Sequence, residues 1–178
     1  MEFLQILKKI IPIFAYVCYK SEVVLQTSIH YLHITLFCLK HHLNYQYKLL
    51  SCISGVDNIF SKYRFSVVYE MLSVIFSSRI RIKINLNEIT AVPSIVNIFI
   101  NANWWEREIW DLFGLYFKNH PDLRRILTDY GFEGHPMRKD FPLSGFIELK
   151  YDLSKKQIIA EKIELAQNFR FYNYETPW

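Results

Sequence analysis

Residues 80–86 read Ile-Arg-Ile-Lys-Ile-Asn-Leu, with apolar and polar side chains in strict alternation. Successive side chains of a β-strand point to opposite faces of its sheet, so this pattern predicts a strand with one buried and one wet face. Residues 47–56 and 65–76 are rich in β-branched and aromatic side chains, which predicts two further strands. Ser77 and Ser78 are predicted to form a tight turn between the last two strands.

Segments before these strands predict two helices and one more strand. The apolar positions within residues 2–16 follow the spacing of one helix face, so we expect a short opening helix there. Residues 22–28 suit a strand and residues 30–42 suit a helix. A sheet covered by helices on one face is the simplest architecture for this order of elements.

A better-defined helix is predicted to begin at Asn103. The Asn103 side chain can accept from the first backbone amides, and Glu106 occupies the third helical position, so the two approximate a capping box. Gly114 supplies the predicted end. Because Arg107 and Asp111 are four residues apart, they can pair across one turn of this helix.

The character of the chain changes after residue 113. Four of the five glycines and three of the six prolines fall within residues 114–145, so regular secondary structure is not expected there. The same stretch is rich in aromatic residues and arginines, a composition typical of protein interfaces and unlike that of flexible linkers. Alternation in residues 147–151 and a possible return strand at residues 157–165 predict a late hairpin.

We therefore predict the α+β fold class. Residues 1–113 would form a core domain, in which a small mixed sheet is flanked by helices. Residues 114–178 would form an extended, irregular arm that docks on a partner and carries the late hairpin. A chain of 178 residues is long enough for one such domain with an appendage and short for two independent domains.

The sequence predicts neither a membrane span nor a targeting signal. The two longest uncharged runs are slightly shorter than a bilayer span and contain residues that are costly in hydrocarbon. The start of the chain has neither the cleavage site of a secretory signal nor the Arg-rich composition of a transit peptide. The abundance of residues with AT-rich codons points to an organelle-like genome. The three cysteines are too widely spaced for a disulfide framework, a zinc site or an iron-sulfur site.

Groups that could bind a metal have a simpler interpretation. His120, Asp122, Asp129 and His135 carry the atoms that metals prefer, but their spacing matches no metal motif. Each of the two histidines precedes a proline, so we expect both to stabilise turns.

No active site is predicted in this chain. Glu106 and Glu108 lie two residues apart at a helix start, where they point to different faces and suit the helix dipole better than acid–base chemistry. No nucleophile elbow, phosphate-binding glycine loop or dinucleotide fingerprint occurs. The pairs Arg124-Arg125 and Arg138-Lys139 could bind phosphates, so an RNA-binding or ribosome-associated role remains the alternative. The near balance of acidic and basic residues around these pairs favours a protein partner.

Residues 103–145 read NWWEREIWDLFGLYFKNHPDLRRILTDYGFEGHPMRKDFPLSG, and this stretch closely resembles the thirty-kilodalton subunit family of respiratory complex I, the NADH:ubiquinone oxidoreductase. The resemblance rests on residue types in a fixed order, namely Glu106-Arg107-Glu108, Asp111, His120 and the run Arg124-Arg125-Ile126-Leu127. Weaker similarity extends back to Ser54 and forward to Trp178. The chain departs from the family pattern at Ile100-Asn101, where Pro-Ala is expected.

The resemblance implies a non-catalytic scaffold subunit in the peripheral arm that passes electrons from NADH toward ubiquinone. NAD, FMN, the iron-sulfur clusters and ubiquinone would belong to other subunits, so this chain would serve NADH:ubiquinone reductase, a proton-translocating enzyme, without a cofactor of its own. Its partners would be the forty-nine-kilodalton quinone-site subunit and neighbouring iron-sulfur subunits, with no nucleic acid. It would lie on the matrix side of the mitochondrial inner membrane, or on the cytoplasmic side in a bacterium, and would meet the membrane only through the complex.

The resemblance also implies which residues contact the partner. Charged residues of the family motif would fix the arm through charge-assisted hydrogen bonds, and the aromatic residues would fill partner pockets. The expected motif and contact residues are Glu106, Arg107, Glu108, Asp111, His120, Arg124, Arg125, Arg138, Lys139 and Asp140.

Overall fold

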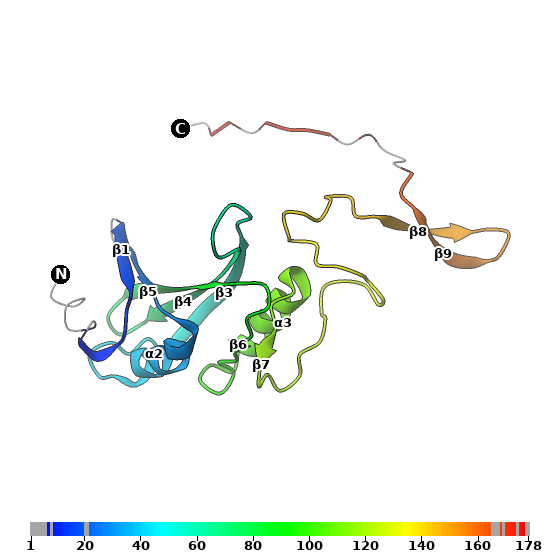
Figure 1. The fold of residues 1–178 in the computed structure, drawn as a ribbon. Helices are drawn as coiled ribbons and strands as arrows, with labels where there is room; N and C mark the ends of the chain where they lie inside the picture. The colour runs from blue at the N-terminus through cyan, green and yellow to red at the C-terminus, as the bar shows by residue number, and fades with distance from the viewer. Residues whose placement is uncertain are drawn as a thin grey trace. The chain divides into compact units, whose positions relative to one another are not determined.

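The structure is a computed structural model that describes residues 7, 9–19, 22–164, 168, 170–173 and 175–176 (Figure 1). The chain forms two compact units, Met1–Lys139 and Asp140–Trp178. The larger unit contains the main sheet and both described helices, and the smaller contains a hairpin. In the parts of the chain that the structure describes, no helix is both long enough and apolar enough to cross a bilayer.

The larger unit is built on a five-stranded sheet with the order β1-β2-β5-β4-β3. Its strands are β1 (Ala15–Tyr19), β2 (Glu22–Gln26), β3 (Leu49–Asp57), β4 (Phe65–Ser73) and β5 (Ser78–Leu86). The pair β2–β5 is parallel and the other neighbours are antiparallel. The predicted α+β class with a small mixed sheet is therefore confirmed.

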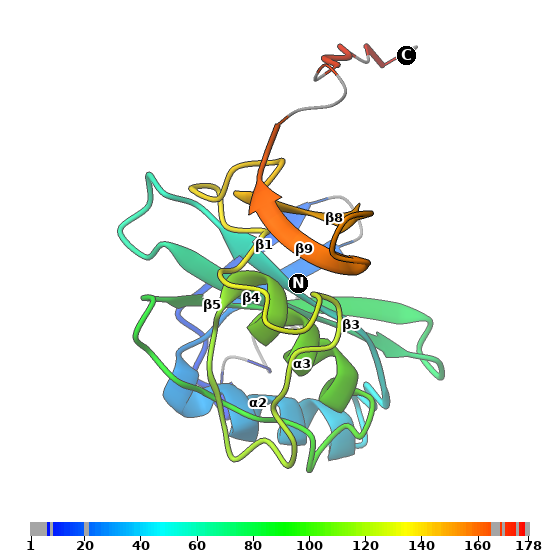
Figure 2. The same ribbon diagram turned by 90° about the vertical axis from the view of Figure 1, so that its right-hand side faces the viewer.

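One face of this sheet carries the hydrophobic core. The alternation in β5 is confirmed, because Ile80, Ile82, Ile84 and Leu86 are all buried. Helices α2 (Ile29–His41) and α3 (Ala102–Phe113) lie on the same side of the sheet (Figure 2). The helix predicted at residues 30–42 corresponds to α2, which turns apolar residues such as Leu36 into the core.

A close approach between α3 and the sheet depends on a glycine. The backbone of Gly55 in β3 faces the ring of Phe113, and an added Cβ would lie 2.7 Å from Phe113 Cδ2. Such a separation is shorter than carbon atoms tolerate without a shift. Gly55 therefore lets the C-terminal end of α3 pack directly on the sheet.

One local prediction in the first half of the chain is wrong, and another holds only in part. The turn between β4 and β5 is not the pair Ser77-Ser78, because Ser78 pairs with Ser73 and the loop comprises residues 74–77. In the predicted opening helix at residues 2–16, residues 7, 9 and 10 are helical, residues 2–6 and 8 lie outside the described residues, and Ala15 and Tyr16 belong to β1 instead. Pairing with β2 decides the conformation there, a tertiary contact that helix periodicity does not report.

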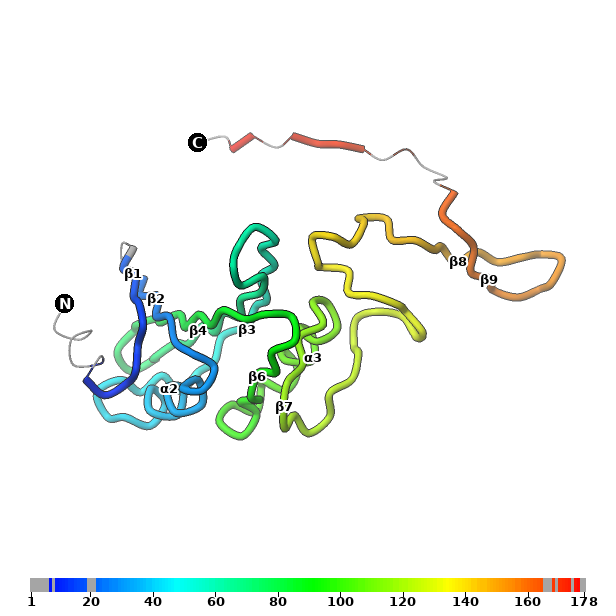
Figure 3. Tube along the Cα trace, in the orientation of Figure 1, coloured from blue at the N-terminus to red at the C-terminus, as the bar shows by residue number. Residues whose placement is uncertain are grey.

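After α3 the chain is largely irregular, as predicted (Figure 3). The exception is β7 (Phe117–Lys118), which pairs in parallel with β6 (Val92–Pro93). Residues 119–139 then run without helix or strand and still belong to the larger compact unit. The boundary between the two compact units thus lies after Lys139, whereas the sequence suggested a boundary after residue 113.

The smaller unit contains the late hairpin, which confirms that prediction. Its strands are β8 (Ile147–Asp152) and β9 (Gln157–Lys162), paired antiparallel in a regular register. Across the ladder, Lys150 Nζ lies 2.5 Å from Glu161 Oε2. The last residue of the predicted return strand, residue 165, lies outside the described part of the chain.

Candidate functional site

Helix α3 carries the first four residues of the family motif and organises the site around it. The helix begins at Ala102, one residue earlier than predicted, and Asn101 precedes it without a side-chain cap. The Asn101 side chain instead donates to Leu50 O over 2.7 Å, which ties the helix start to β3. The predicted capping role of Asn103 is therefore wrong. The predicted end is confirmed, because Gly114 adopts the left-handed conformation with φ of 76°.

Glu106 points inward from α3 and is fully buried. Its Oε2 accepts from Ser94 Oγ over 2.6 Å, and its Oε1 accepts from Ile95 N over 2.7 Å. Burial raises the pKa of Glu106 to about 7, and these two hydrogen bonds offset that effect only in part. The carboxyl group thus joins α3 to the segment after β6 and does not complete a capping box.

The His120 ring lies beside Glu106 with its side chain buried. His120 Nε2 is 3.2 Å from Asn103 O, and Asp122 N donates to His120 Nδ1 over 3.1 Å. A carbonyl oxygen can only accept and a backbone N–H can only donate, so these contacts suit a ring that donates from Nε2 and accepts at Nδ1. His120 stabilises the turn at residues 120–122, as the sequence predicted, and also joins this turn to α3.

Asp111 collects hydrogen bonds from the chain that follows β7. Its Oδ2 accepts from the backbone amides of Ile126, Leu127 and Thr128 over 3.1, 2.7 and 3.0 Å. Its Oδ1 accepts from Thr128 Oγ1 over 2.7 Å. Burial alone would raise the pKa of Asp111, but the donors together outweigh it and lower the pKa. One carboxylate therefore holds a three-residue loop in place.

The predicted ion pair between Arg107 and Asp111 is replaced by other contacts. Asp111 instead lies near Arg125, whose Nη1 is 3.6 Å from Oδ1 and also donates to Gly134 O over 2.9 Å. The Arg107 guanidinium lies over the ring of Trp104, 5.5 Å from its centroid. Asp111 is buried and faces its backbone donors, so it does not lie on the exposed face of the helix.

Residues 135–138 cover the C-terminal end of α3. His135 Nδ1 lies 2.9 Å from Asp111 O, Met137 N donates to Leu112 O over 3.0 Å, and Arg138 Nε donates to Phe113 O over 2.7 Å. Gly114 N donates to Trp110 O. All four final carbonyl groups of the helix thus have partners, which a helix end requires when it is covered.

A second buried carboxylate holds the end of this segment on the sheet. Asp57 accepts from Arg64 Nε and Nη2 over 2.9 and 3.0 Å and from Lys139 N over 2.8 Å. The bonds from Arg64 are the main reason that the pKa of Asp57 is lowered, although burial opposes them. Arg138 also pairs with Glu88. Residues 119–139 are therefore irregular but fixed at several points.

The ten expected motif and contact residues separate into two groups in the structure. Glu106, Asp111, His120, Arg125 and Arg138 make the internal contacts described above. Arg107 and Glu108 are half-buried on α3, whereas Arg124, Lys139 and Asp140 are exposed. Arg124 is 70% exposed and its Nε lies 3.0 Å from Asp122 Oδ2.

Several residues that shape this site were not expected from the sequence. Ser94, Thr128 and Asp57 accept or donate the bonds that fix the motif residues, and Arg64 pairs with Asp57. Ser94 and Asp57 lie in stretches of weaker family similarity, which was the available signal. Among the described residues, no group of three or more His, Cys, Asp or Glu side chains could hold a metal ion.

Comparison with known proteins identifies the family. Residues 25–147 match the family described as respiratory-chain NADH dehydrogenase, 30 Kd subunit. The chain belongs to this family. NADH-ubiquinone oxidoreductase subunit 9 of Reclinomonas americana is 52% identical over 89% of this chain and 78% of its own length. NADH dehydrogenase [ubiquinone] iron-sulfur protein 3 of Beta trigyna is 51% identical over 85% of this chain and 79% of its own length.

The fold of this chain is similar to that of a chain in a solved structure. A chain in the structure of the membrane-bound sulfane sulfur reductase, an archaeal respiratory membrane complex, superimposes with a TM-score of 0.62. The match covers 80% of this chain and 85% of that one at 20% identity, so it concerns the fold alone. Family and relatives together make this chain a subunit of NADH:ubiquinone oxidoreductase, complex I of the respiratory chain.

Proposed function

We propose that this complex I subunit is a non-catalytic scaffold of the peripheral arm, which supports electron transfer from NADH to ubiquinone by holding other subunits together. It would bind no NAD, FMN, iron-sulfur cluster or ubiquinone itself. The observation that carries this proposal is the use of the buried polar groups: Glu106, Asp111 and His120 all bond to the chain's own backbone and side chains. These three groups are thus engaged in holding the fold of the described chain and are not directed at a substrate.

We further propose that residues 114–146 dock on the forty-nine-kilodalton quinone-site subunit and neighbouring iron-sulfur subunits. Within the larger unit, the loop held by Asp111 turns Leu127 outward at 53% exposure, and Tyr130 is fully exposed. Met137 is exposed although its backbone N–H is bonded to α3. Apolar side chains on a fixed irregular backbone suit partner pockets, because little ordering entropy is lost when they bind.

The motif residues would serve this docking in two ways. Glu106, Asp111, His120, Arg125 and Arg138 would set the shape of the segment through the internal bonds described above. Arg107, Glu108, Arg124, Lys139 and Asp140 would contribute charge at the surface that meets the partner.

The location would follow from the complex. The relatives named subunit 9 and iron-sulfur protein 3 are ubiquinone-reducing NADH dehydrogenase subunits, which supports a place in the mitochondrial inner membrane complex. We propose the matrix side, with membrane association only through other subunits.

Native electrophoresis of solubilised membranes tests this proposal. The chain is tagged, and its migration is compared with that of the band that stains for NADH dehydrogenase activity. We expect co-migration, and we expect Tyr130→Asp to lower the fraction in that band about tenfold, because it puts a charge into an apolar pocket. Ile89→Asp is the matched control, since Ile89 is 96% exposed and lies outside the proposed docking segment. Migration with ribosomes or as free monomer would overturn the scaffold role and favour the RNA-binding alternative.

A further inference from the structure

The loop between β4 and β5 exposes three consecutive apolar side chains. Val74, Ile75 and Phe76 are 70%, 60% and 50% exposed, and with Ser77 they form the hairpin tip, residues 74–77. Ser77 has φ of 48°, a left-handed conformation that Gly or Asn usually adopts. Hairpin loops are normally built from Gly, Asn, Asp, Ser and Pro. The tip therefore breaks the local rules of turn composition and gains no burial within the described chain.

A shallow hollow of about 310 Å³ lies beside this tip. Phe76, Tyr47 and Val23 supply apolar parts of its wall, and Ser78 Oγ donates to Tyr47 Oη over 3.2 Å at its rim. One apolar side chain of a partner would fit a space of this size. The tip and the hollow thus offer a projection and a recess next to each other.

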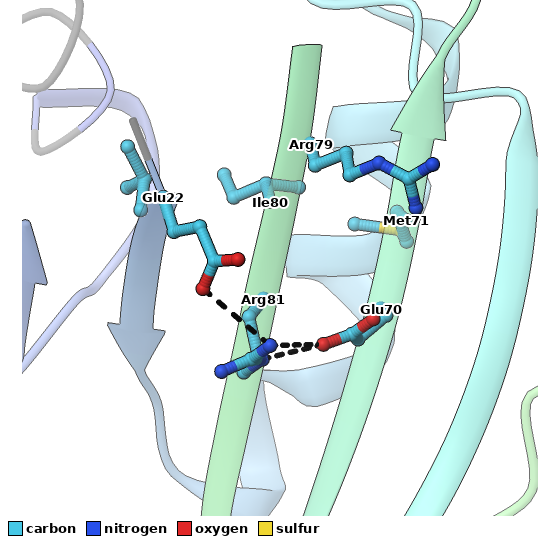
Figure 4. A pocket seen from close by; sticks show the side chains of 7 residues that line it. Glu22, Glu70, Met71, Arg79, Ile80 and Arg81 are labelled. Carbon is cyan, nitrogen blue, oxygen red and sulfur yellow. Dashed lines mark hydrogen bonds and ion pairs between the residues drawn. The ribbon is translucent and has the colours of Figure 1, made fainter. Parts of the chain in front are cut away.

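Among the described residues that line the hollow, Arg79 is the one that carries a charge. It also lines the adjacent hollow that Figure 4 shows. In that neighbouring site Glu22 and Glu70 both pair with Arg81, and no ion pair joins either of them to Arg79 within the described residues. Lys48 is exposed and immediately precedes Leu49, which pairs with Leu72 near the base of the tip. The two cations would attract acidic groups.

We propose that the hairpin tip is a second docking surface, which binds an apolar segment flanked by carboxylates on a neighbouring subunit of complex I. The proposal rests on the membership of the complex proposed above. Ile75 and Phe76 would bury their side chains in the partner, and one apolar side chain of the partner would enter the hollow. Carboxylates of the partner would pair with Arg79 and Lys48. The composition of the tip is then explained by its burial in the assembly.

Two measurements on the intact complex test this surface. A zero-length carbodiimide couples lysine amines directly to carboxylates, and mass spectrometry identifies the joined peptides. We expect Lys48 to couple to an Asp or Glu of a different subunit. In parallel, Ile75→Asp should lower the fraction of the chain in the NADH-oxidising band about tenfold relative to Ile89→Asp, with an unchanged melting temperature of the purified chain.

The possible results separate the two proposals. If Ile75→Asp assembles within twofold of Ile89→Asp, or if Lys48 couples to a second copy of this chain, the tip surface is overturned. Coupling of Lys139 to another subunit tests the docking of residues 114–146 independently. That docking proposal would therefore survive a failure of the tip surface. If the wild-type chain is absent from the stained band, both proposals fail together.

Discussion

Two buried carboxyl groups on one helix behave in opposite ways. Glu106 and Asp111 both lie on α3 with no exposed surface, and burial pushes both pKa values upward. Glu106 accepts two hydrogen bonds and its pKa rises to about 7, whereas Asp111 accepts four and its pKa is lowered. At Asp111 the four donors outweigh the effect of burial on the pKa, whereas at Glu106 the two donors do not.

The two ends of α3 also hold different parts of the chain. The Glu106 end joins the segment after β6 to the helix through a hydroxyl and one amide. The Asp111 end and the following carbonyl groups hold residues 126–128 and 135–138 of the irregular segment, which has no sheet or helix of its own. We expect the Asp111 end to carry more of the stability, because its bonds replace missing secondary structure.

The largest effect is expected at Asp111. In Asp111→Asn the side chain loses its charge, and its NH₂ group replaces one of the two acceptor oxygens, so it faces either the amides of residues 126–128 or the hydroxyl of Thr128. The free energy of unfolding should fall by about 3–4 kcal/mol at pH 7. Urea denaturation of the purified chain measures it, with the exposed Asp122→Asn as control. A loss below about 1 kcal/mol would contradict the role of Asp111 as the main acceptor.

The difference between wild type and Asp111→Asn should narrow in acid. A lowered pKa means that the stabilisation by the carboxylate is present above the unfolded pKa and is lost as pH falls through the folded pKa. Urea titrations at pH 3 and pH 7 compare the two. An equal difference at both values would show that charge plays no part.

Glu106 should give the opposite pH dependence. Its pKa of about 7 in the folded chain exceeds the ordinary glutamate value of 4.5, so between these two pH values the folded state holds a proton that the unfolded state has released. Stability is then greatest below the unfolded value, and about 3 kcal/mol is lost as pH rises to 7. Glu106→Gln keeps an acceptor for Ile95 N and should remove this loss. Urea denaturation at several pH values from 5 to 8 measures the free energy of unfolding, which should change less with pH in the variant than in the wild type. The same pH dependence in both proteins would contradict the raised pKa.

Substitutions at Gly114 and Gly131 test how tightly residues 135–138 pack on the C-terminal end of α3. Gly114 and Gly131 have nearly the same φ, 76° and 73°, but an added Cβ at Gly114 would lie 2.6 Å from His135 and 2.7 Å from Arg138. The space around Gly131 is open. Gly114→Ala should therefore cost about 2 kcal/mol more than Gly131→Ala, since both share the backbone strain. Thermal melting measures the difference, and equal losses would mean that His135 and Arg138 move aside easily.

The smallest effect on folding is expected at Arg124. Its side chain is mostly exposed and pairs with Asp122, so Arg124→Ala should change the free energy of unfolding by less than about 0.5 kcal/mol. The informative measurement is assembly, in which native electrophoresis should reveal a weaker association with complex I. If the NADH-oxidising band contains as much of the variant as of the wild type, Arg124 has no docking role.

The structure explains why some sequence predictions succeeded. Alternation along residues 80–86 reports which side of a strand each side chain faces, and β5 follows it. Gly114 ended the helix as predicted because a left-handed residue is a local requirement of a helix end. The run from Asn103 to Gly145 carried the family resemblance, which the match over residues 25–147 confirms.

The sequence alone thus determined strands β2 to β5, the end of α3, the late hairpin and the family, because each depends on residues close together in the chain or on their order. Only the tertiary structure decided what the motif residues touch. Asp57 meets Lys139 N across 82 positions, and Asp111 bonds to residues 15 to 17 positions away. Neither contact leaves a local pattern, since hydrogen bonding at this range depends on how the folded chain brings distant backbone groups together.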